Sequence, residues 1–283
     1  MNVLITGAAG MIGSLTVAAI ANKGHSVFGV DRVDSHQTSE NYTHLVADLS
    51  DAESFSKIVE EHHIDRVIHL AALAHTDNQT DLSYERYYHV NVECAENVFS
   101  ASAKLGVPVL FISTADVYGF EKEKVSARTQ PKPVTVYGKT KYMAEQKCCE
   151  ICASSKYTIF RFAPVYTDTV VRDIQKRYYL KYPNIAYLVG KGTEYEVLYI
   201  ETAIERMLQW LSVEPQNDIH NVKNPERMNT AKKIQEEKLN GRAKHVLKLP
   251  RWLLLFGFYI TRLTGKNKYT YLLNKVVNPL RTE

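Results

Sequence analysis

Several features that mark other classes of protein are missing from this chain of 283 residues. It contains no run of roughly 18 apolar residues, so no segment is expected to cross a membrane. It shows no internal repeat and no low-complexity stretch, which argues against solenoid and fibrous architectures. A strand-like run at residues 3–5 follows the first residue so closely that we expect no signal peptide, and therefore a cytoplasmic protein.

Cysteine is also scarce, with four in the whole chain. Cys149 and Cys152 have the spacing Cys-x-x-Cys, but they fall inside a predicted helix and no second pair accompanies them. A zinc site needs four ligands, and a redox pair favours a helix N-terminus, where the dipole stabilises the thiolate. We therefore expect small buried residues at helix contacts, with no disulfide and no metal site.

Acidic residues are almost absent from the stretch 241–283, which holds nine Lys or Arg and one Glu. Its net charge is +8, which leaves −4 on the rest of a chain whose total is +4. The apolar run 252–260 lies between Lys248, Arg251 and Arg262. We expect a helix pair packed on the protein with solvated lysines. The alternative is a helix that lies at the inner face of a membrane, which a basic-flanked apolar run with Trp and Tyr can do. No nucleic-acid-binding motif is present, so we expect no nucleic-acid partner.

Glycine, in contrast, is placed where it matters near the start of the chain. Residues 1–6 form a strand-like run, and a helical pattern follows at 11–23. The spacing Gly-x-x-Gly-x-x-Gly at this junction allows a tight turn, and the amides and positive dipole of the following helix suit a pyrophosphate. The predicted contacts with a dinucleotide come from Gly7, Gly10, Met11, Ile12 and Gly13. A glycine loop without a ligand is the alternative.

A carboxylate closes the second predicted strand, residues 26–30. Asp31 lies 18 residues after Gly13, where a carboxylate accepts hydrogen bonds from the adenosine ribose diol. It favours NAD, because it would repel the 2′-phosphate of NADP. Arg32 is a signal for NADP, since a guanidinium beside the ribose could bind that phosphate. We expect NAD, with NADP as the less favoured cofactor.

Strand-like and helical patterns alternate along the first part of the chain. Further strands are predicted at 43–47, 66–71, 109–114 and 157–162, and helices at 52–62, 85–105 and 137–155. This alternation predicts an α/β fold of the Rossmann type, with a doubly wound parallel sheet covered by helices on both faces. Ligands of such sheets bind at the carboxyl ends of the strands, where we expect Gly7, Asp31, Asp48, Ala71 and Thr114.

The alternation decays after about Pro164 into a mixed region with Lys-rich and Tyr-rich helices. We therefore expect a dinucleotide-binding domain at 1–165 and a smaller α/β substrate-binding region at 166–283, which includes the basic tail.

Tyr137 and Lys141 are the candidates for proton transfer. A tyrosine with a pKa near 10 is a poor base at neutral pH unless a positive charge stabilises its phenolate. Residues four apart share a helix face, so Lys141 is expected to lower the pKa of Tyr137 and to reach the nicotinamide ribose. Thr114, at the end of a strand, can hydrogen-bond the same substrate oxygen. The alternative is an ordinary surface pair on an amphipathic helix.

Taken in order, these motifs resemble the extended short-chain dehydrogenase/reductases, within them the NAD-dependent nucleotide-sugar epimerase/dehydratase group. The matching positions are 6–13, Asp31, 48–49, 69–72, Asn91, 112–119, 137–141 and Arg161. The resemblance implies that Thr114, Tyr137 and Lys141 are catalytic. It implies a wider cofactor-binding set that includes Asp48 and Leu49 at the adenine, together with Leu70, Ala71, Ala72 and Asn91. It also implies a homodimer joined through a four-helix bundle of residues 85–105 and 137–155.

The chain departs from this family where the substrate is bound. Dehydratases of the group carry an Asp-Glu pair after the threonine, whereas this chain has Ala115 and Asp116, so 4,6-dehydration is disfavoured. Relatives usually place an arginine on the nucleotide diphosphate near residues 190–201, where this chain has Glu196. The substrate is therefore not a nucleotide sugar, or its phosphates are bound by another arginine, for which the candidates are Arg172, Arg177 and Arg227.

Three functions fit these observations. The first is an NAD-dependent epimerase of a nucleotide-activated sugar, in which Tyr137 deprotonates the 4-hydroxyl, a transient 4-keto sugar forms and hydride returns to the other face. The second is an NAD(P)H-dependent 4-ketosugar or carbonyl reductase, in which Tyr137 donates the proton. The third is a non-catalytic dinucleotide-binding sensor or scaffold. Cofactor turnover separates the first two, because an epimerase keeps its NAD whereas a reductase exchanges it.

Overall fold

The computed structural model describes the whole chain except residues 36, 38, 75–82, 122 and 266. These residues form two compact units, each assembled from separate stretches of the chain. The first unit contains Met1–Val117, Thr135–Phe162 and Ala203–His220, and the second contains Tyr118–Val134, Ala163–Thr202 and Asn221–Glu283. The chain therefore passes from one unit to the other several times.

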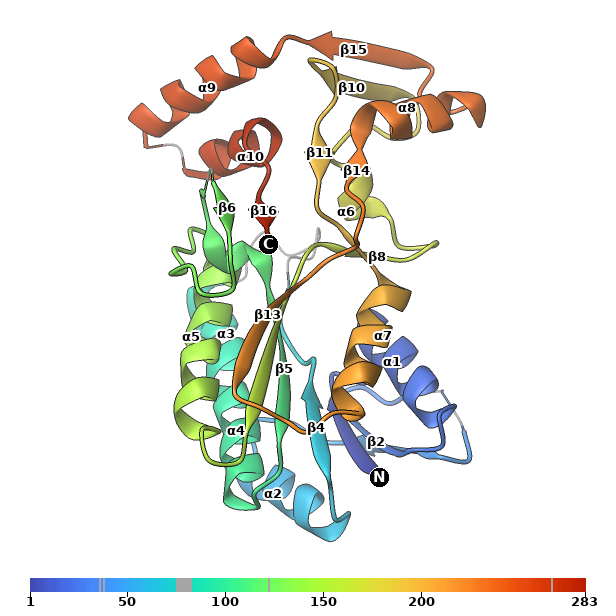
Figure 1. The fold of residues 1–283 in the computed structure, drawn as a ribbon, viewed down its shortest axis with the longest axis vertical. Coiled ribbons are helices and arrows are strands. Elements are labelled where there is room, and N and C mark those ends of the chain that lie inside the picture. Colours follow the sequence, from blue (N-terminus) through green and yellow to red (C-terminus); the bar gives the residue numbers. More distant parts are fainter. Residues whose placement is uncertain (36, 38, 75–82, 122, 266) are drawn as a thin grey trace. The chain divides into compact units, whose positions relative to one another are not determined.

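A seven-stranded sheet forms the centre of the first unit, in the order β13-β7-β5-β4-β1-β2-β3 (Figure 1). Its strands are β1 (Asn2–Thr6), β2 (Ser26–Asp31), β3 (Tyr42–Val46), β4 (Arg66–His69), β5 (Val109–Thr114), β7 (Tyr157–Phe162) and β13 (Asp218–Val222). The strands from β7 to β3 all pair in parallel. The strand order runs outward from β1 in both directions, which places a ligand crevice at the carboxyl ends beside β1. The predicted Rossmann-type α/β class is confirmed.

Helices cover both faces of this sheet (Figure 1). On one face lie α2 (Ala52–Glu61), α4 (Cys94–Lys104) and α5 (Val136–Ile151), and on the other lie α1 (Met11–Ala21) and α7 (Ile200–Leu211). The first group packs side chains such as Phe55, Phe99 and Cys148 against Val67 and Phe111 of the strands. Because both faces are covered, every residue of β5 except Thr114 and every residue of β7 except Tyr157 is buried, and we predicted the limits of both strands correctly from the sequence.

The predicted helix 85–105 is interrupted. It consists of α3 (Tyr84–Tyr88), a π-helical segment (His89–Glu93) and α4. A π-turn inserts one residue into the helical repeat and often accompanies a functional requirement. Here the segment carries Asn91, whose side chain is buried.

The cysteines behave as small packing residues. All four lie in the described part of the chain, and none forms a disulfide. Cys94 and Cys148 are buried in the core beneath α4 and α5, as predicted. Cys152 is buried as well, but it directly follows the last residue of α5 instead of lying in mid-helix.

The second unit contains several small sheets. One has the order β15-β10-β9, and the others pair β11 with β14, β12 with β8, and β16 with β6. The strands are β6 (Lys124–Val125), β8 (Val165–Tyr166), β9 (Tyr179–Lys181), β10 (Ile185–Val189), β11 (Glu194–Tyr195), β12 (Leu198–Tyr199), β14 (Met228–Asn229), β15 (His245–Leu249) and β16 (Arg281–Thr282). Its helices are α6 (Arg172–Gln175), α8 (Thr230–Leu239), α9 (Arg251–Leu263) and α10 (Asn267–Val277). This unit has a core of its own around Tyr178, Tyr195 and Ile234.

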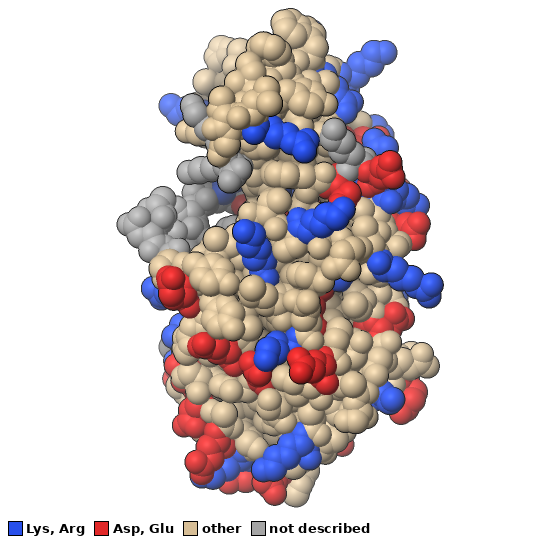
Figure 2. All heavy atoms as spheres, turned by 90° about the vertical axis from the view of Figure 1, so that its left-hand side faces the viewer, with Lys and Arg blue, Asp and Glu red and all other residues tan. Residues whose placement is uncertain are grey.

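Helices α9 and α10 pack against each other and carry many of the exposed apolar side chains of the second unit. In Figure 2, the upper end, where these helices lie in Figure 1, is a broad tan surface with Lys and Arg at its margins. Within the described part of the chain, no helix combines the length and the hydropathy needed to span a bilayer.

Candidate active site

The glycine turn joins β1 to α1 through contacts that leave no room for side chains. Gly7 has a positive φ of 71°, and a Cβ on it would lie 2.8 Å from the backbone nitrogen of Ala71. A Cβ on Gly13 would lie 2.0 Å from the carbonyl oxygen of Gly7. Only glycine at these positions lets β1, α1 and the segment after β4 come together.

The N-terminus of α1 is available to an anion. The helix begins at Met11 with Gly10 as its N-cap, and glycine has no side chain that could cap the first amides. The first turn, Met11 to Ser14, contains no acidic residue. Unsatisfied amides and the positive end of the helix dipole suit a pyrophosphate, so this turn fits the phosphates of a dinucleotide.

Asp31 stands beside this turn at the carboxyl end of β2. Its Oδ2 accepts a hydrogen bond from the amide of Ala9 at 3.1 Å, and its Oδ1 accepts one from the amide of Val33 at 3.2 Å. The side chain remains partly exposed, so the carboxylate can accept further hydrogen bonds, as a ribose diol would require.

Arg32 and Asp48 lie close enough to interact electrostatically. The amide of Ser50 donates to Asp48 Oδ1 at 2.9 Å and is the main reason that the pKa of Asp48 is lowered, with Arg32 contributing its positive charge. Asp48 is exposed, whereas Leu49 points into the core. The guanidinium of Arg32 therefore has an acidic neighbour, which weakens it as a binding group for a 2′-phosphate.

The segment after β4 is bonded to the end of β1. The amide of Leu70 donates to the carbonyl of Thr6, and the amide of Ala71 donates to the hydroxyl of Thr6, both at 3.3 Å. Leu70, Ala71 and the following Ala72 are all partly exposed. They line the same edge of the sheet as the glycine turn.

Asn91 has a different environment from the other cofactor candidates. It is buried, its Oδ1 accepts from the amide of Leu73 at 2.7 Å, and its Nδ2 donates to the carbonyl of Leu73 and to the hydroxyl of Thr140, each at 3.1 Å. Both amide hydrogens are therefore used within the protein. The side chain ties the segment after β4 to α5.

The start of α5 is pressed against the turn that follows β5. The hydroxyl of Thr135 caps the helix by accepting from the amide of Gly138 at 2.9 Å. A Cβ on Gly138 would lie 2.8 Å from the carbonyl oxygen of Asp116. Thr114, the last residue of β5, accepts a hydrogen bond from the amide of Asp116 at 3.2 Å. The structure therefore brings Thr114 and the first turn of α5, which carries Tyr137, to one place.

The pKa of Tyr137 is shifted in the direction opposite to our expectation. Burial raises the pKa of this phenol, and the negative charge of Asp116 and the neighbouring phenol of Tyr87 raise it further. Lys141 is not among the groups that shift it, although it lies four residues along the helix. Desolvation and negative neighbours, and not the ammonium, therefore set the direction of the shift.

The ammonium of Lys141 points instead toward the sheet. Its Nζ lies 4.0 Å from the centre of the Phe111 ring, and the side chain is 2% exposed. Burial lowers the pKa of Lys141 to about 7, against the opposing effect of Glu145. Near neutral pH, this amine can therefore both hold and release a proton.

A buried ion pair between Glu145 and Arg161, which we did not predict from the sequence, connects the helix of Tyr137 and Lys141 to the sheet. Glu145 Oε1 accepts hydrogen bonds from the Ser113 hydroxyl at 2.5 Å and from Arg161 Nε at 3.0 Å. Glu145 Oε2 accepts one from Arg161 Nη2 at 2.7 Å. All three side chains are buried, and they join α5 to β5 and β7. Glu145 follows Lys141 by four residues, so helical spacing from Tyr137 could have identified it.

In the second unit, Glu196 is a structural anchor. It accepts from the amide and hydroxyl of Thr282 at 2.9 and 2.8 Å and pairs with Lys223 at 2.8 Å. Arg227 lies 3.6 Å from the same carboxylate. The guanidinium of Arg177 lies 4.6 Å from the centre of the Tyr195 ring. The side chain of Arg172 lies outside the described part of the structure.

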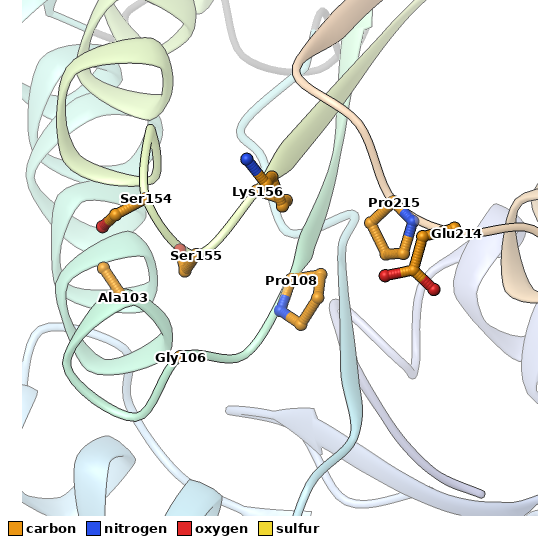
Figure 3. A pocket seen from close by; sticks show the side chains of 8 residues that line it. All are labelled: Ala103, Gly106, Pro108, Ser154, Ser155, Lys156, Glu214 and Pro215. Carbon is orange, nitrogen blue, oxygen red and sulfur yellow. The ribbon is translucent and has the colours of Figure 1, made fainter.

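A surface hollow of the first unit lies at the opposite edge of the sheet (Figure 3). Among the residues that line it are Pro108, just before β5, and Lys156, just before β7. The amino ends of parallel strands are not where ligands of this fold bind. The hollow is therefore distinct from the site around Thr114.

Comparisons with known proteins agree with this geometry. The sequence model of the NAD dependent epimerase/dehydratase family matches residues 3–219. The chain is 32% identical over 158 residues to UDP-glucose 4-epimerase of Bacillus subtilis, which takes in 52% of this chain and 46% of that protein. It is 30% identical over 283 residues to N-acetyl-alpha-D-glucosaminyl-diphospho-ditrans,octacis-undecaprenol 4-epimerase of Escherichia coli O157:H7, or 94% of this chain and 81% of the relative.

A solved structure, UDP-glucose 4-epimerase with UDP-glucose from Thermotoga maritima, has a TM-score of 0.72 and 25% identity, covering 88% of this chain and 86% of that one. The chain spans about half the length of the first curated relatives that it matches. The family match nevertheless covers most of the chain and includes Gly7, Asp31, Thr114, Tyr137 and Lys141. The chain belongs to the NAD dependent epimerase/dehydratase family.

Proposed function

We propose that this protein is an NAD-dependent 4-epimerase of a sugar activated by a diphosphate, with a nucleotide sugar as the first candidate substrate. The observation that carries the proposal is the close contact of Gly138 with Asp116, which holds Tyr137 beside Thr114. Both stand at the same edge of the sheet as the glycine turn. The start of α5, which carries Tyr137, thus lies at the edge where a dinucleotide would bind.

The proposed cofactor site uses the first unit alone. NAD supplies reversible hydride transfer when it is bound. The amides around Gly10, Met11 and Ile12 would hold the pyrophosphate, and Asp31 would bind the adenosine ribose and favour NAD over NADP. We assign the remaining contacts to Asp48, Leu70, Ala71 and Ala72, and to the backbone of Leu49, whose side chain is in the core. Asn91 acts by positioning the segment after β4, since both of its amide hydrogens are already used.

Proton transfer falls to Tyr137. We propose that it removes the proton of the 4-hydroxyl and later returns it, while the Thr114 hydroxyl donates a hydrogen bond that orients the substrate oxygen. A phenol whose pKa is raised by burial needs a positive charge nearby in order to act as a base. We assign this charge to Lys141, four residues further along α5, whose ammonium lies over the Phe111 ring in this structure and would have to turn toward Tyr137.

The residues that follow Thr114 favour epimerisation over dehydration, because they include one carboxylate instead of two adjacent ones. Elimination of water needs one group to protonate the leaving hydroxyl and another to remove a proton from carbon. After Thr114 the chain offers Ala115 and then Asp116, and Asp116 raises the pKa of Tyr137. Asp116 is a single carboxylate, so it cannot serve as both the acid and the base that elimination of water requires.

The test begins with the cofactor of the freshly purified full chain. We expect mass spectrometry to find NAD in near-stoichiometric amount, and NMR to show a C4 isomer when UDP-glucose or UDP-N-acetylglucosamine is added without reductant. Turnover that requires added NADH or NADPH would instead make the protein a reductase. Cofactor with no turnover on any sugar would support the binding-protein reading.

A second candidate substrate is a sugar joined through a diphosphate to a polyprenol. It is favoured by the E. coli relative, because that match extends through 94% of this chain, whereas the UDP-glucose 4-epimerase of B. subtilis matches 52%. Parallel assays with UDP-N-acetylglucosamine and N-acetylglucosaminyl-diphospho-undecaprenol in detergent would separate the two, since only the true substrate should give the isomer at a useful rate.

We further propose a cytoplasmic homodimer that buries the outer surface of α3 and α5. Tyr84 and Met143 meet there, with the Tyr84 hydroxyl 3.7 Å from the sulfur of Met143, and both remain exposed. Exposed apolar side chains on adjacent helices suit a helix-bundle interface. Light scattering after gel filtration should give twice the monomer mass, and Met143→Glu should reduce it. A monomer at all concentrations would contradict the proposal.

A further inference from the structure

Helix α9 leaves a continuous row of large apolar side chains in contact with solvent. Trp252 is 67% exposed and Leu263 is 86% exposed. We call the row the α9 stripe, and its members are Trp252, Leu253, Phe256, Tyr259, Ile260 and Leu263. A solvent-facing helix normally presents polar residues at such positions, and a contiguous exposed apolar patch marks a surface that binds something.

The stripe occupies one face of the helix. Trp252, Phe256, Tyr259 and Leu263 recur at steps of four, three and four residues, which brings them into line on an α-helix. Phe258 points the other way and is 1% exposed. The helix is therefore apolar on both sides, with one face already used for packing and the other left outside.

The buried face of α9 packs against α10, so the stripe belongs to a packed helix pair. A Cβ on Gly257 would lie 3.5 Å from Leu273 of α10, so the two helices meet closely at this glycine. The guanidinium of Arg251 donates to the carbonyl of Val277 at the end of α10, at 2.7 Å. Tyr269 and Leu272 of α10 are exposed as well and extend the apolar surface.

The charges around the stripe are positive. Lys244, Lys248, Arg251 and Arg262 are all exposed, and Glu283 is the only acidic residue after position 240. Figure 2 shows Lys and Arg side chains at the margins of the tan upper surface. Tyrosine and tryptophan, both present in the stripe, are the side chains that favour the boundary between headgroups and acyl chains.

We propose that the α9 stripe docks on the surface of a lipid bilayer that contains anionic lipids. The helix has 13 residues, or about 20 Å at 1.5 Å per residue, so it would lie in the interface without crossing the bilayer. Apolar side chains enter the acyl boundary while the surrounding cations face the headgroups. This inference goes beyond the proposed function, because it holds whichever sugar the enzyme takes.

The test uses the full chain and vesicles of phosphatidylcholine with or without phosphatidylglycerol. We expect the protein to float with the anionic vesicles and much less with the neutral ones. Tryptophan emission gives a direct readout, because Trp210 is buried and Trp252 is the exposed member of the pair. Emission should shift to shorter wavelength with anionic vesicles and be quenched by lipids brominated in their acyl chains.

Variants separate the apolar and the electrostatic parts. Phe256→Glu should lower the vesicle partition coefficient at least about tenfold, because an exposed apolar side chain that would enter the acyl boundary is replaced by a charge. Arg262→Ala should lower it roughly fivefold and only on anionic vesicles. Leu239→Glu is the matched control, since Leu239 is 82% exposed at the end of α8 and lies outside the stripe. It should bind as the unchanged protein does.

Two results would overturn the proposal. The first is equal recovery of the unchanged protein and Phe256→Glu on anionic vesicles, with no shift in Trp252 emission. The second is a dimer in solution that Leu263→Glu converts to monomer without any vesicle binding, which would assign the stripe to a second copy of the chain. Epimerase activity of Phe256→Glu on a water-soluble nucleotide sugar should be unchanged, so loss of docking and failure of the proposed function can be told apart.

Discussion

Helices α5 and α9 depart from the usual burial pattern in opposite directions. Helix α5 buries Lys141 and Glu145 inside the protein, whereas α9 exposes Trp252 and Leu263 to solvent. Each departure costs free energy: charges lose hydration in the first helix, and apolar surface stays in water in the second. Because local rules are broken mainly where function demands it, the two helices mark two different tasks. In our proposals, α5 serves proton transfer and α9 docks on a membrane surface.

The largest expected effect comes from removing the phenol of α5. Tyr137→Phe should lower kcat by roughly 10²–10⁴-fold, because it deletes the group that transfers the proton and little else. The amount of NAD released from the purified protein should stay the same. Tyr142→Phe, on the same helix, is the control and should keep its activity. Unchanged turnover in Tyr137→Phe would remove the catalytic assignment.

The next effect concerns stability. Glu145→Gln should lower the free energy of unfolding by about 3–5 kcal/mol, because it leaves the Arg161 guanidinium buried without its counter-charge. Urea denaturation followed by circular dichroism measures the loss. Glu150→Gln, an exposed position on the same helix, should change stability little. Equal stability of the two variants would mean that water reaches the ion pair.

The buried Lys141 of α5 should make the stability of the protein depend on pH. Its pKa falls to about 7 in the folded protein, against 10.5 in the unfolded chain, so the folded state disfavours the ammonium. Below pH 7 this cost is present in full, and it disappears as the pH rises from 7 toward 10.5. Lys141→Met should therefore raise Tm most at pH 6 and progressively less at alkaline pH, while it abolishes turnover. Lys139→Met, an exposed control, should show no such trend, and an equal shift at all pH values would refute the assignment.

The smallest effects come from one glycine in each helix. Gly138→Ala would place a Cβ 2.8 Å from the Asp116 carbonyl, so we expect lower Tm and lower activity. Gly257→Ala would place one 3.5 Å from Leu273, an ordinary contact, and should be neutral or more stable by up to about 1 kcal/mol through helix propensity. Differential scanning calorimetry of both variants tests the pair. A destabilised Gly257→Ala would mean that α9 and α10 pack more tightly than the structure indicates.

The sequence was informative wherever local pattern and fold agree. Strands β5 and β7 lie where we predicted them from their mostly apolar residues, because burial on both faces leaves a strong signal. The glycine turn could be read because Gly7 and Gly13 satisfy a steric need that no other residue meets. The position of Asp31 could also be predicted, because it is the last residue of β2 and the carboxyl ends of parallel strands lie together.

Features that depend on neighbours in the folded structure could not be predicted from the sequence. The spacing of Tyr137 and Lys141 is visible, but the direction of the Tyr137 pKa depends on Asp116, Tyr87 and burial. The ion pair of Glu145 with Arg161 joins residues from different elements. The two-residue strands of the second unit are too short to produce a periodic pattern.

Cutting the gene after codon 165 would not release the first unit intact. Helix α7 and strand β13, which cover one face and one edge of its sheet, come from Ile200–Leu211 and Asp218–Val222. A fragment without them would leave β7 as an open edge, ready to pair with other chains and aggregate. A ribosome finishes this sheet only after it has already made much of the other unit. The first unit therefore cannot complete its sheet before residues 163–202 of the second unit have been synthesised.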